Sequence, residues 1–411
     1  MAGRPELNVA TPAAGTCVTD NSAAQPLAGL VVVELGTSVA APTATMILAE
    51  LGAQVFKVEN PRGGDDARAW GPPFFNGDGM NFVALNRNKR SVAIDLKNEA
   101  ERAALRRFIL ARADIVVQNL RAGVVEKFKL DAASLTAEKP SLIYCNLAAF
   151  GARGPRADKP GYDPLMQAFG GIMSITGHDG DEPVRVGPAI IDKGTGMWLI
   201  IGALAALHRR TATGRGCVVD GSLYETALHW MAVPTAQYLA SQRVPRRMGS
   251  ENLALAPYRA FEASDGWLVI AAGNDGQFAR VCDLLGLKGL AADERFKTNA
   301  RRVANRAELI PLLAVEIAKR TASDLLAALE TAGVPAGPVN RLDQVFADPQ
   351  VVARGLRQDL ARPGAAPVPT VRSPIVIDGI PCAATTASPK LGADTDAVLE
   401  RLQAGNDPWL T

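Results

Sequence analysis

The sequence predicts an α/β protein with a large doubly wound, Rossmann-like parallel-sheet domain and a smaller α+β domain. An apolar and β-branched run at 27–35, a helix-like stretch at 43–51 and a second strand at 54–59 form a βαβ unit. Strands and helices then keep alternating to about residue 215. Charge, proline and glycine interrupt this pattern at 243–249, where we place a domain boundary.

Composition argues against several classes of protein. The chain has 411 residues with 44 basic and 42 acidic side chains, so its net charge of +2 favours neither nucleic acid nor a membrane surface. Its five cysteines form no CxxC pair, which argues against a zinc site or disulfide framework and suits a reducing cytoplasm. Residues 1–25 lack the features of a targeting peptide and are expected to be a disordered leader. The longest apolar run, 197–207, is shorter than the about 20 residues that cross a bilayer.

The first half of the chain supplies candidates for ligand binding. The turn after the first strand contains one glycine and no G-x-G-x-x-G, which argues against a dinucleotide dehydrogenase. The segment 86–97 carries four cations, which suits either a polyphosphate ligand or a solvated basic edge. The alternation continues with a helix at 99–113, strands at 114–119 and 141–146, and polar loops at 150–155 and 159–163 that are typical of loops lining a site.

The stretch 186–207 is the centre of the predicted site. A strand-like apolar run, 186–191, ends at Asp192, and an almost wholly apolar helix follows, which predicts a helix buried on all sides. The helix N-terminus favours an ionised acid at this position, and Gly194 and Gly196 permit close approach of a ligand. From these residues alone, Asp192 is either an N-cap or a catalytic carboxylate.

The second half predicts a linker, the small domain and a return to the large domain. We expect a strand at 217–220, a helix at 222–237, a hairpin at 257–271, helices at 277–285, 308–320 and 323–332, extended chain to about residue 378, and a last helix at 395–402. The domain bounds that follow are 26–215 for the large domain, completed by 380–411, linkers at 216–245 and 336–379, and 246–335 for the small domain.

Several short motifs, in this order and spacing, are shared with a known family. They lie at 27–30, 51–59, 86–91, 151–155, 213–216, 333–338 and 389–392. Over residues 27–402 the chain resembles the family III CoA-transferases, which include formyl-CoA and carnitine CoA-transferases. The resemblance implies that Asp192 is the nucleophile, that coenzyme A enters as acyl-CoA without a metal or redox cofactor, and that two chains form a homodimer of interlocked rings.

The resemblance also implies roles for individual residues. Gly194 and Gly196, with Phe150 and Tyr162, would form the oxyanion and substrate loop. Residues along bound CoA would be Ser38, Val39, Ala40, Asn88, Arg90, Ile94, Leu96, Lys97, Asn119, Leu120 and Lys127. At the position of Asn60 the formyl-CoA enzyme has an arginine that contacts CoA, and Arg62 would take its place here. Asp394 stands where the family usually has histidine.

Within the family the sequence favours CoA transfer. Related α-methylacyl-CoA racemases carry Gly-His-Asp where this chain has Gly161-Tyr162-Asp163, and tyrosine, with an ordinary pKa of about 10, is a poor acid–base group at neutral pH. The resemblance is strongest to succinate–hydroxymethylglutarate CoA-transferases, so the acceptor is expected to be a dicarboxylate whose distal end meets Arg153, Arg246 or Arg247. A thioester hydrolase, a racemase and a non-catalytic CoA-binding protein are the alternatives.

Overall fold

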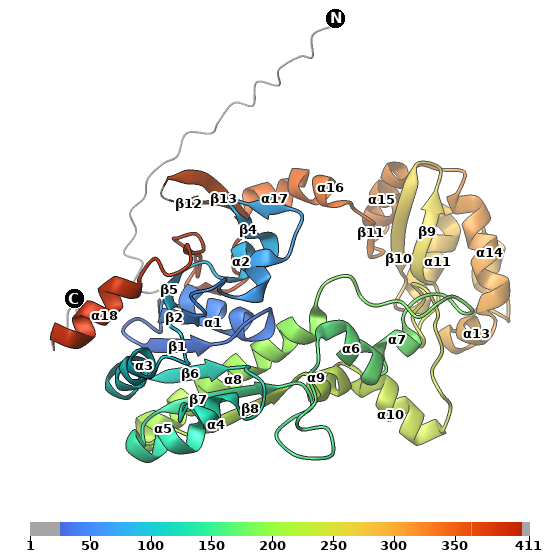
Figure 1. Ribbon diagram of the computed structural model, residues 1–411. Coiled ribbons are helices and arrows are strands. Elements are labelled where there is room, and N and C mark those ends of the chain that lie inside the picture. Colours follow the sequence, from blue (N-terminus) through green and yellow to red (C-terminus); the bar gives the residue numbers. More distant parts are fainter. Residues whose placement is uncertain (1–24, 363, 405–411) are drawn as a thin grey trace, which may run out of the picture.

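The computed structural model describes residues 25–362 and 364–404, so the expected leader lies outside the described residues except for Gln25. A six-stranded parallel sheet forms the centre of the larger unit (Figure 1). Its strands in spatial order are β5 (Lys89–Ala93), β2 (Gln54–Glu59), β1 (Val31–Leu35), β6 (Ile115–Gln118), β7 (Ile143–Ala148) and β8 (Val218–Ser222). Counted along the chain this order is 3-2-1-4-5-6, so the predicted parallel sheet is confirmed and the order reverses between β1 and β6.

Helices cover both faces of the sheet because its strands are apolar on both sides. Val32 and Val33, neighbours in β1, are both fully buried but belong to different core clusters. One cluster contains α1 (Ala40–Glu50) and α8 (Ile190–Thr213), and the other contains α3 (Glu99–Arg112), α4 (Val124–Lys127) and α5 (Ala132–Glu138). The larger unit also contains α2 (Met80–Leu85), α6 (Asp163–Phe169), α7 (Ile172–Ile175), α9 (Leu223–Trp230), α10 (Ala232–Ser241), the 3-10 helix η2 (Asp66–Ala69), and the short hairpin of β3 (Phe74–Phe75) with β4 (Asp78–Gly79).

A smaller unit with its own core lies to one side of the sheet (Figure 1). Its antiparallel sheet contains β9 (Tyr258–Ala263), β10 (Gly266–Ala271) and β11 (Ala336–Pro338), and the β9–β10 hairpin confirms the prediction. Its helices are α11 (Asp275–Leu284), α12 (Lys288–Ala292), α13 (Asn299–Ala304), α14 (Arg306–Ile317) and α15 (Ala322–Thr331).

Three expectations about local structure are wrong. The run 186–191 is not a strand, because Gly187 and Pro188 interrupt it and no neighbouring strand pairs with it; α8 instead begins at Ile190. The helix expected at 222–237 divides into α9 and α10, since Pro234 cannot donate the bond that would continue it. The chain after the small unit is not simply extended, as it forms α16 (Leu342–Ala347), α17 (Pro349–Ala353), and the hairpins β12 (Arg357–Arg362) with β13 (Ala365–Val371) and β14 (Val376–Ile377) with β15 (Ile380–Pro381).

The helix α8 is apolar but is not buried on all sides, which corrects a fourth expectation. Met197 and Ile201 are 53% and 55% exposed, whereas Leu199 and Ala203 are buried against the sheet. Over its 24 residues α8 is long and apolar enough to cross a membrane by length and composition, but half of its most apolar window is buried inside the protein. One face of α8 therefore belongs to the core and the other is uncovered in the single chain.

The C-terminal segment returns to the sheet and closes its β5 edge. The helix α18 (Thr395–Ala404) lies beside α3 and β5, as expected for the last helix (Figure 1). A carboxylate oxygen of Asp394 accepts a hydrogen bond from Ser91 N at 2.9 Å, and Thr395 Oγ1 accepts one from Ala93 N at 2.8 Å. These side chains satisfy donors that an open edge strand leaves unpaired.

We therefore expect Asp394→Ala to destabilise the protein. Loss of a hydrogen bond to a partly buried amide costs about 1 kcal/mol, which lowers Tm by about 2–4 °C for a unit of this size. Thermal unfolding followed by circular dichroism measures the change. Glu400→Ala, a change at an exposed acid beyond the first turn of α18, is the control and should leave Tm nearly unchanged; equal losses in the two variants contradict this role of Asp394.

Candidate active site

The start of α8 is held by a second acid, Asp163. This residue opens α6, and its carboxylate accepts hydrogen bonds from Ile191 N at 2.7 Å and Asp192 N at 3.1 Å. Gln167 Nε2, one turn further along α6, donates to the other carboxylate oxygen at 2.5 Å. Asp163 is buried, so these contacts are shielded from water. The position and orientation of the first turn of α8 are thereby fixed from α6.

Asp192 lies in this first turn and is only 8% exposed. Among the described residues, no side chain or backbone group donates a hydrogen bond to its carboxylate. Burial, and then the negative charge of Asp163, raises the pKa of Asp192 to about 7. We expected the helix N-terminus to favour the ionised acid, but the N–H groups that would do so bind Asp163 instead, so burial and like charge decide the pKa.

The two glycines after Asp192 have packing roles in this structure, and their assignment to an oxyanion loop stays a prediction. A Cβ on Gly194 would lie 2.8 Å from the Trp230 ring, and one on Gly196 would lie 2.8 Å from Ala40 O in α1. Both glycines are inside the helix, where the backbone N–H groups bond to the preceding turn. The amide groups at the helix start also have acceptors. Ile190 N donates to Pro188 O, the next two amides donate to the Asp163 carboxylate, and Lys193 N donates to Ala189 O.

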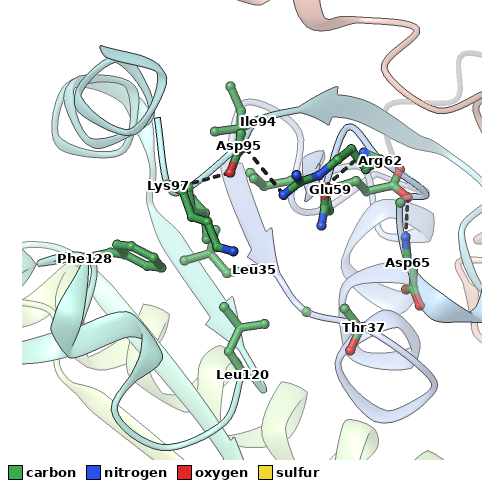
Figure 2. A pocket seen from close by; sticks show the side chains of 15 residues that line it. Leu35, Thr37, Glu59, Arg62, Asp65, Ile94, Asp95, Lys97, Leu120 and Phe128 are labelled. Carbon is green, nitrogen blue, oxygen red and sulfur yellow. Dashed lines mark hydrogen bonds and ion pairs between the residues drawn. The ribbon is translucent and has the colours of Figure 1, made fainter. Parts of the chain in front are cut away.

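A cavity of about 230 Å³ opens where the strand order reverses between β1 and β6. In open α/β sheets ligands bind at this switch point, outside the carboxyl ends of the strands. Figure 2 shows Lys97, Leu120 and Phe128 around this space, with Thr37 on the other side. Arg62 and Asp95 form an ion pair of 3.8 Å at the same cavity. Apolar walls with a few cations suit a ligand that combines an aromatic ring with phosphate.

The structure gathers only part of the expected CoA-binding set. Residues expected for CoA that line the cavity are Arg62, Ile94, Leu96, Lys97 and Leu120. Asn119 lies directly behind it, bonded to Thr37, and Ser38, Val39 and Ala40 continue from its wall towards α1.

Three other residues expected to bind CoA do not line the cavity. The side-chain oxygen of Asn88 accepts hydrogen bonds from Thr385 N and Thr386 N, so this residue anchors the returning C-terminal segment. The Arg90 guanidinium lies 5.6 Å from the centre of the Phe56 ring, and Lys127 Nζ lies 5.8 Å from that of Phe128.

The expected substrate-loop residues differ in their exposure. The Phe150 ring packs edge-on against Phe169, with 5.3 Å between ring centres, while Tyr162 is 59% exposed directly before Asp163. The sequence reasoning missed Asp163, Thr37, Asp95 and Phe128. Only Asp163 gave a usable signal, since an acid before Pro164 is typical of a helix start.

A parallel sheet with a ligand crevice at its switch point and a buried, perturbed acid at a helix start is the architecture of an α/β enzyme. Residues 27–395 match the model of CoA-transferase family III, and the chain belongs to this family. Its enzyme class is therefore CoA-transferase, as expected.

The relatives agree with this membership. The chain is similar to a succinate–glutarate CoA-transferase of Agrobacterium fabrum, with 43% identity over 384 residues that span 92% of this chain and 96% of that protein. It is 34% identical over 389 residues to the succinyl-CoA:glutarate CoA-transferase of Homo sapiens, spanning 95% and 89% of the two chains. The crystal structure of a CaiB/BaiF family protein from Brucella suis shares the fold with a TM-score of 0.83 at 43% identity, covering 92% of this chain and 99% of that one.

The pKa of Asp192 predicts how activity depends on pH. If transfer requires the ionised carboxylate, the rate falls as the pH is lowered through about 7. Asp163→Asn removes the like charge but keeps an oxygen for the helix amides, so the acidic limb of the kcat/KM profile should move to lower pH. Burial, the larger cause, remains, so the pKa stays above its ordinary value. Asp158→Asn, at an exposed acid in the preceding loop, is the control, and an equal displacement in both variants contradicts the coupling.

Proposed function

We propose that this protein transfers coenzyme A from succinyl-CoA to a small dicarboxylate, with Asp192 as nucleophile. The observation that carries the proposal is Asp192 itself, a buried carboxylate without a hydrogen-bond donor among the described residues, in the first turn of the helix that packs against α1. The names of the relatives described above support succinyl-CoA as donor and glutarate as the first acceptor to test. We also propose a cytoplasmic location, because acyl-CoA substrates are available there.

The reaction then proceeds through two kinds of covalent intermediate. The Asp192 carboxylate attacks the thioester carbonyl and expels CoA thiolate, which leaves an acyl–aspartyl anhydride. The thiolate attacks the aspartyl carbonyl, releases succinate and forms an aspartyl-CoA thioester. The acceptor carboxylate attacks this thioester, and the returning thiolate then takes the acceptor acyl group and regenerates Asp192. Because no described residue donates a hydrogen bond to the carboxylate, attack breaks no such bond within the described part of the chain.

Of the three candidate arginines, one has a guanidinium without an ion pair or hydrogen bond among the described residues. Arg246 pairs with Asp179 at 3.5 Å, and the Arg247 guanidinium donates to the carbonyl oxygens of Met173 and Asp181. Among the described residues Arg153, which follows Phe150 in the loop after β7, makes no ion pair. We therefore favour Arg153 for recognition of a dicarboxylate.

The uncovered face of α8 supports the homodimer that the family resemblance implies. Large apolar side chains from α8, α9 and α10 form this α8–α10 face; they are Met197, Trp198, Ile201, Leu204, Leu228, Trp230, Val233, Tyr238 and Leu239. Exposed apolar surface on this scale marks a protein interface, and a second copy of the chain is the occupant we propose. Interlocking of the two chains is part of the same proposal.

Asp192→Ala should abolish transfer and retain CoA binding. The variant lacks the carboxylate that becomes the anhydride, whereas the cavity at the switch point is unchanged. Protein, succinyl-CoA and a panel of carboxylic acids are incubated together, products are identified by mass spectrometry, and CoA affinity is measured by calorimetry. Turnover by the variant overturns the role of Asp192, and release of free CoA and succinate by the wild type without any acceptor product would indicate a hydrolase.

Ile201→Lys should disrupt the dimer, because a charge at the centre of an apolar interface loses its water without gaining a partner. Interlocked chains separate only on unfolding, so both proteins are first refolded from denaturant. Light scattering after size exclusion should then give twice the chain mass of 43.2 kDa for the wild type and a smaller mass for the variant. Val315→Lys, at a residue 58% exposed on α14, is the control that should remain dimeric. A wild-type mass of one chain, or an unchanged mass for Ile201→Lys, contradicts this interface.

A further inference from the structure

The segment 36–42, which we call the 36–42 loop, contains the connection after β1 and the first three residues of α1, and it leads from the cavity towards α8. Its first two residues line the cavity. Near its other end, the carbonyl oxygen of Ala40 lies 2.8 Å from the point where a Cβ on Gly196 would stand. Gly196 is four residues after Asp192 and so lies on the same side of α8, one turn away. In the proposed function, an acyl-CoA bound in the cavity would extend along this segment towards Asp192.

Two buried charged residues hold the first part of the loop. Lys57, on β2, is completely buried, and its ammonium donates to Gly36 O at 2.7 Å and pairs with Asp65 at 2.8 Å. The second oxygen of Asp65 accepts a hydrogen bond from Ser38 N at 2.9 Å. Ser38 has φ of 72°, a left-handed conformation that serine rarely adopts. These contacts stabilise a backbone conformation that the loop sequence alone disfavours.

A second buried lysine holds the end of the loop. Lys89, on β5, donates to Pro42 O at 2.9 Å. Glu34, on β1, lies between the two lysines, with its carboxylate oxygens 2.7 Å from the Lys57 ammonium and 2.9 Å from that of Lys89. Burial opposes its charge, but the two ammonium groups outweigh burial and lower the pKa of Glu34 to about 2. The four residues Glu34, Lys57, Asp65 and Lys89 form what we term the ion cluster, in which two positive and two negative charges balance.

Asn119 fixes the loop from the opposite strand. Its side-chain oxygen accepts a hydrogen bond from Thr37 N at 2.9 Å, and its amide nitrogen donates to Thr37 O at 2.9 Å. Asn119 directly follows β6, the strand across the switch point from β1. Consecutive residues of the loop are therefore held from both sides of the crevice.

The ion cluster positions the backbone of the loop more than it stabilises the fold. Buried ion pairs contribute little net stability compared with apolar side chains of similar volume, because desolvation offsets their attraction. Their directional bonds do, however, fix the backbone atoms they contact. Three bonds of the ion cluster reach the loop, at Gly36, Ser38 and Pro42, and Asn119 adds Thr37. The other bonds that leave the cluster go to Thr45, Ala67 and Asn86.

We propose that the ion cluster and Asn119 are positioning residues for CoA transfer, which hold the 36–42 loop so that the thioester of a bound acyl-CoA lies within reach of Asp192. The inference rests on the proposed function. Misplacement of reacting groups by about 1 Å can reduce a rate by roughly a hundredfold. Loss of the loop contacts should therefore reduce kcat, while the affinity for CoA, set mainly in the cavity, changes little.

Asn119→Ala is the first variant, since it removes both bonds to Thr37 without leaving a buried charge. We expect kcat for transfer from succinyl-CoA to fall about ten- to a hundredfold and the Kd for CoA to change by less than about threefold. Product formation in quenched assays gives kcat and KM, calorimetry gives the Kd for CoA, and circular dichroism checks that the variant is folded. A parallel loss of CoA affinity would instead show that Asn119 binds the ligand directly.

Asp65→Ala and Asp65→Asn test the ion cluster. Alanine removes the acceptor for Ser38 N, whereas asparagine keeps an oxygen there, so Asn should recover most of the kcat that Ala loses. The matched control is Asp114→Ala at the other end of β1, where Asp114 accepts a bond from Val31 N at 2.9 Å and pairs with Arg210 at 3.0 Å. Because Asp114 is more exposed than Asp65, this control should lose less thermal stability, and it should keep its kcat.

The outcomes separate the inference from the function it rests on. If the wild type transfers CoA to none of the acids, the proposed function fails whatever the variants do. If the wild type is active and folded Asn119→Ala and Asp65→Ala match it in kcat, the positioning role is wrong. The role is equally wrong if Asp114→Ala loses as much kcat as Asp65→Ala, or if Asn at position 65 is no better than Ala. If Asp65→Ala does not fold, Asn119→Ala decides the question alone.

Discussion

The hydrogen bonds from the start of α8 to the Asp163 carboxylate determine the character of the active site. They occupy the amides that would otherwise stabilise a negative charge on Asp192, and they place a like charge beside it. Asp192 therefore has a fixed backbone and a side chain without hydrogen-bond donors among the described residues. A carboxylate in this state is costly in the free protein, and in the proposed role of nucleophile this cost would be relieved when it forms a covalent bond to an acyl group.

The sheet brings this carboxylate and the cavity together. The reversal of strand order between β1 and β6 opens the crevice, and the loop that leaves β1 leads into α1, which packs against α8. The close crossing of these helices is possible only because Gly196 lacks a side chain. The glycines after Asp192 thus contribute to the site through helix packing, and the thioester end of a ligand would approach Asp192 along this crossing.

Those parts of the fold and of the candidate site that depend on a local sequence pattern could be predicted from the sequence. The β-branched runs at 27–35 and 54–59 and the acid at Asp192 each depend on neighbouring residues, and the parallel sheet and family membership follow from their order. Other features depend on contacts distant in sequence. The apolar run 186–191 has the composition of a strand but no partner, the exposure of Ile201 depends on what lies beside α8, and Asn88 meets a segment about 300 residues later. Local periodicity contains no information on such contacts.

The closure of the β5 edge has a consequence for biosynthesis. Ser91 emerges from the ribosome long before Asp394, which follows 303 residues later. At about 5–20 residues per second this leaves the nascent sheet with an open edge for roughly 15–60 s. During that interval the strand can pair with other chains, so partly synthesised molecules need protection, and fragments that end before the return segment should aggregate.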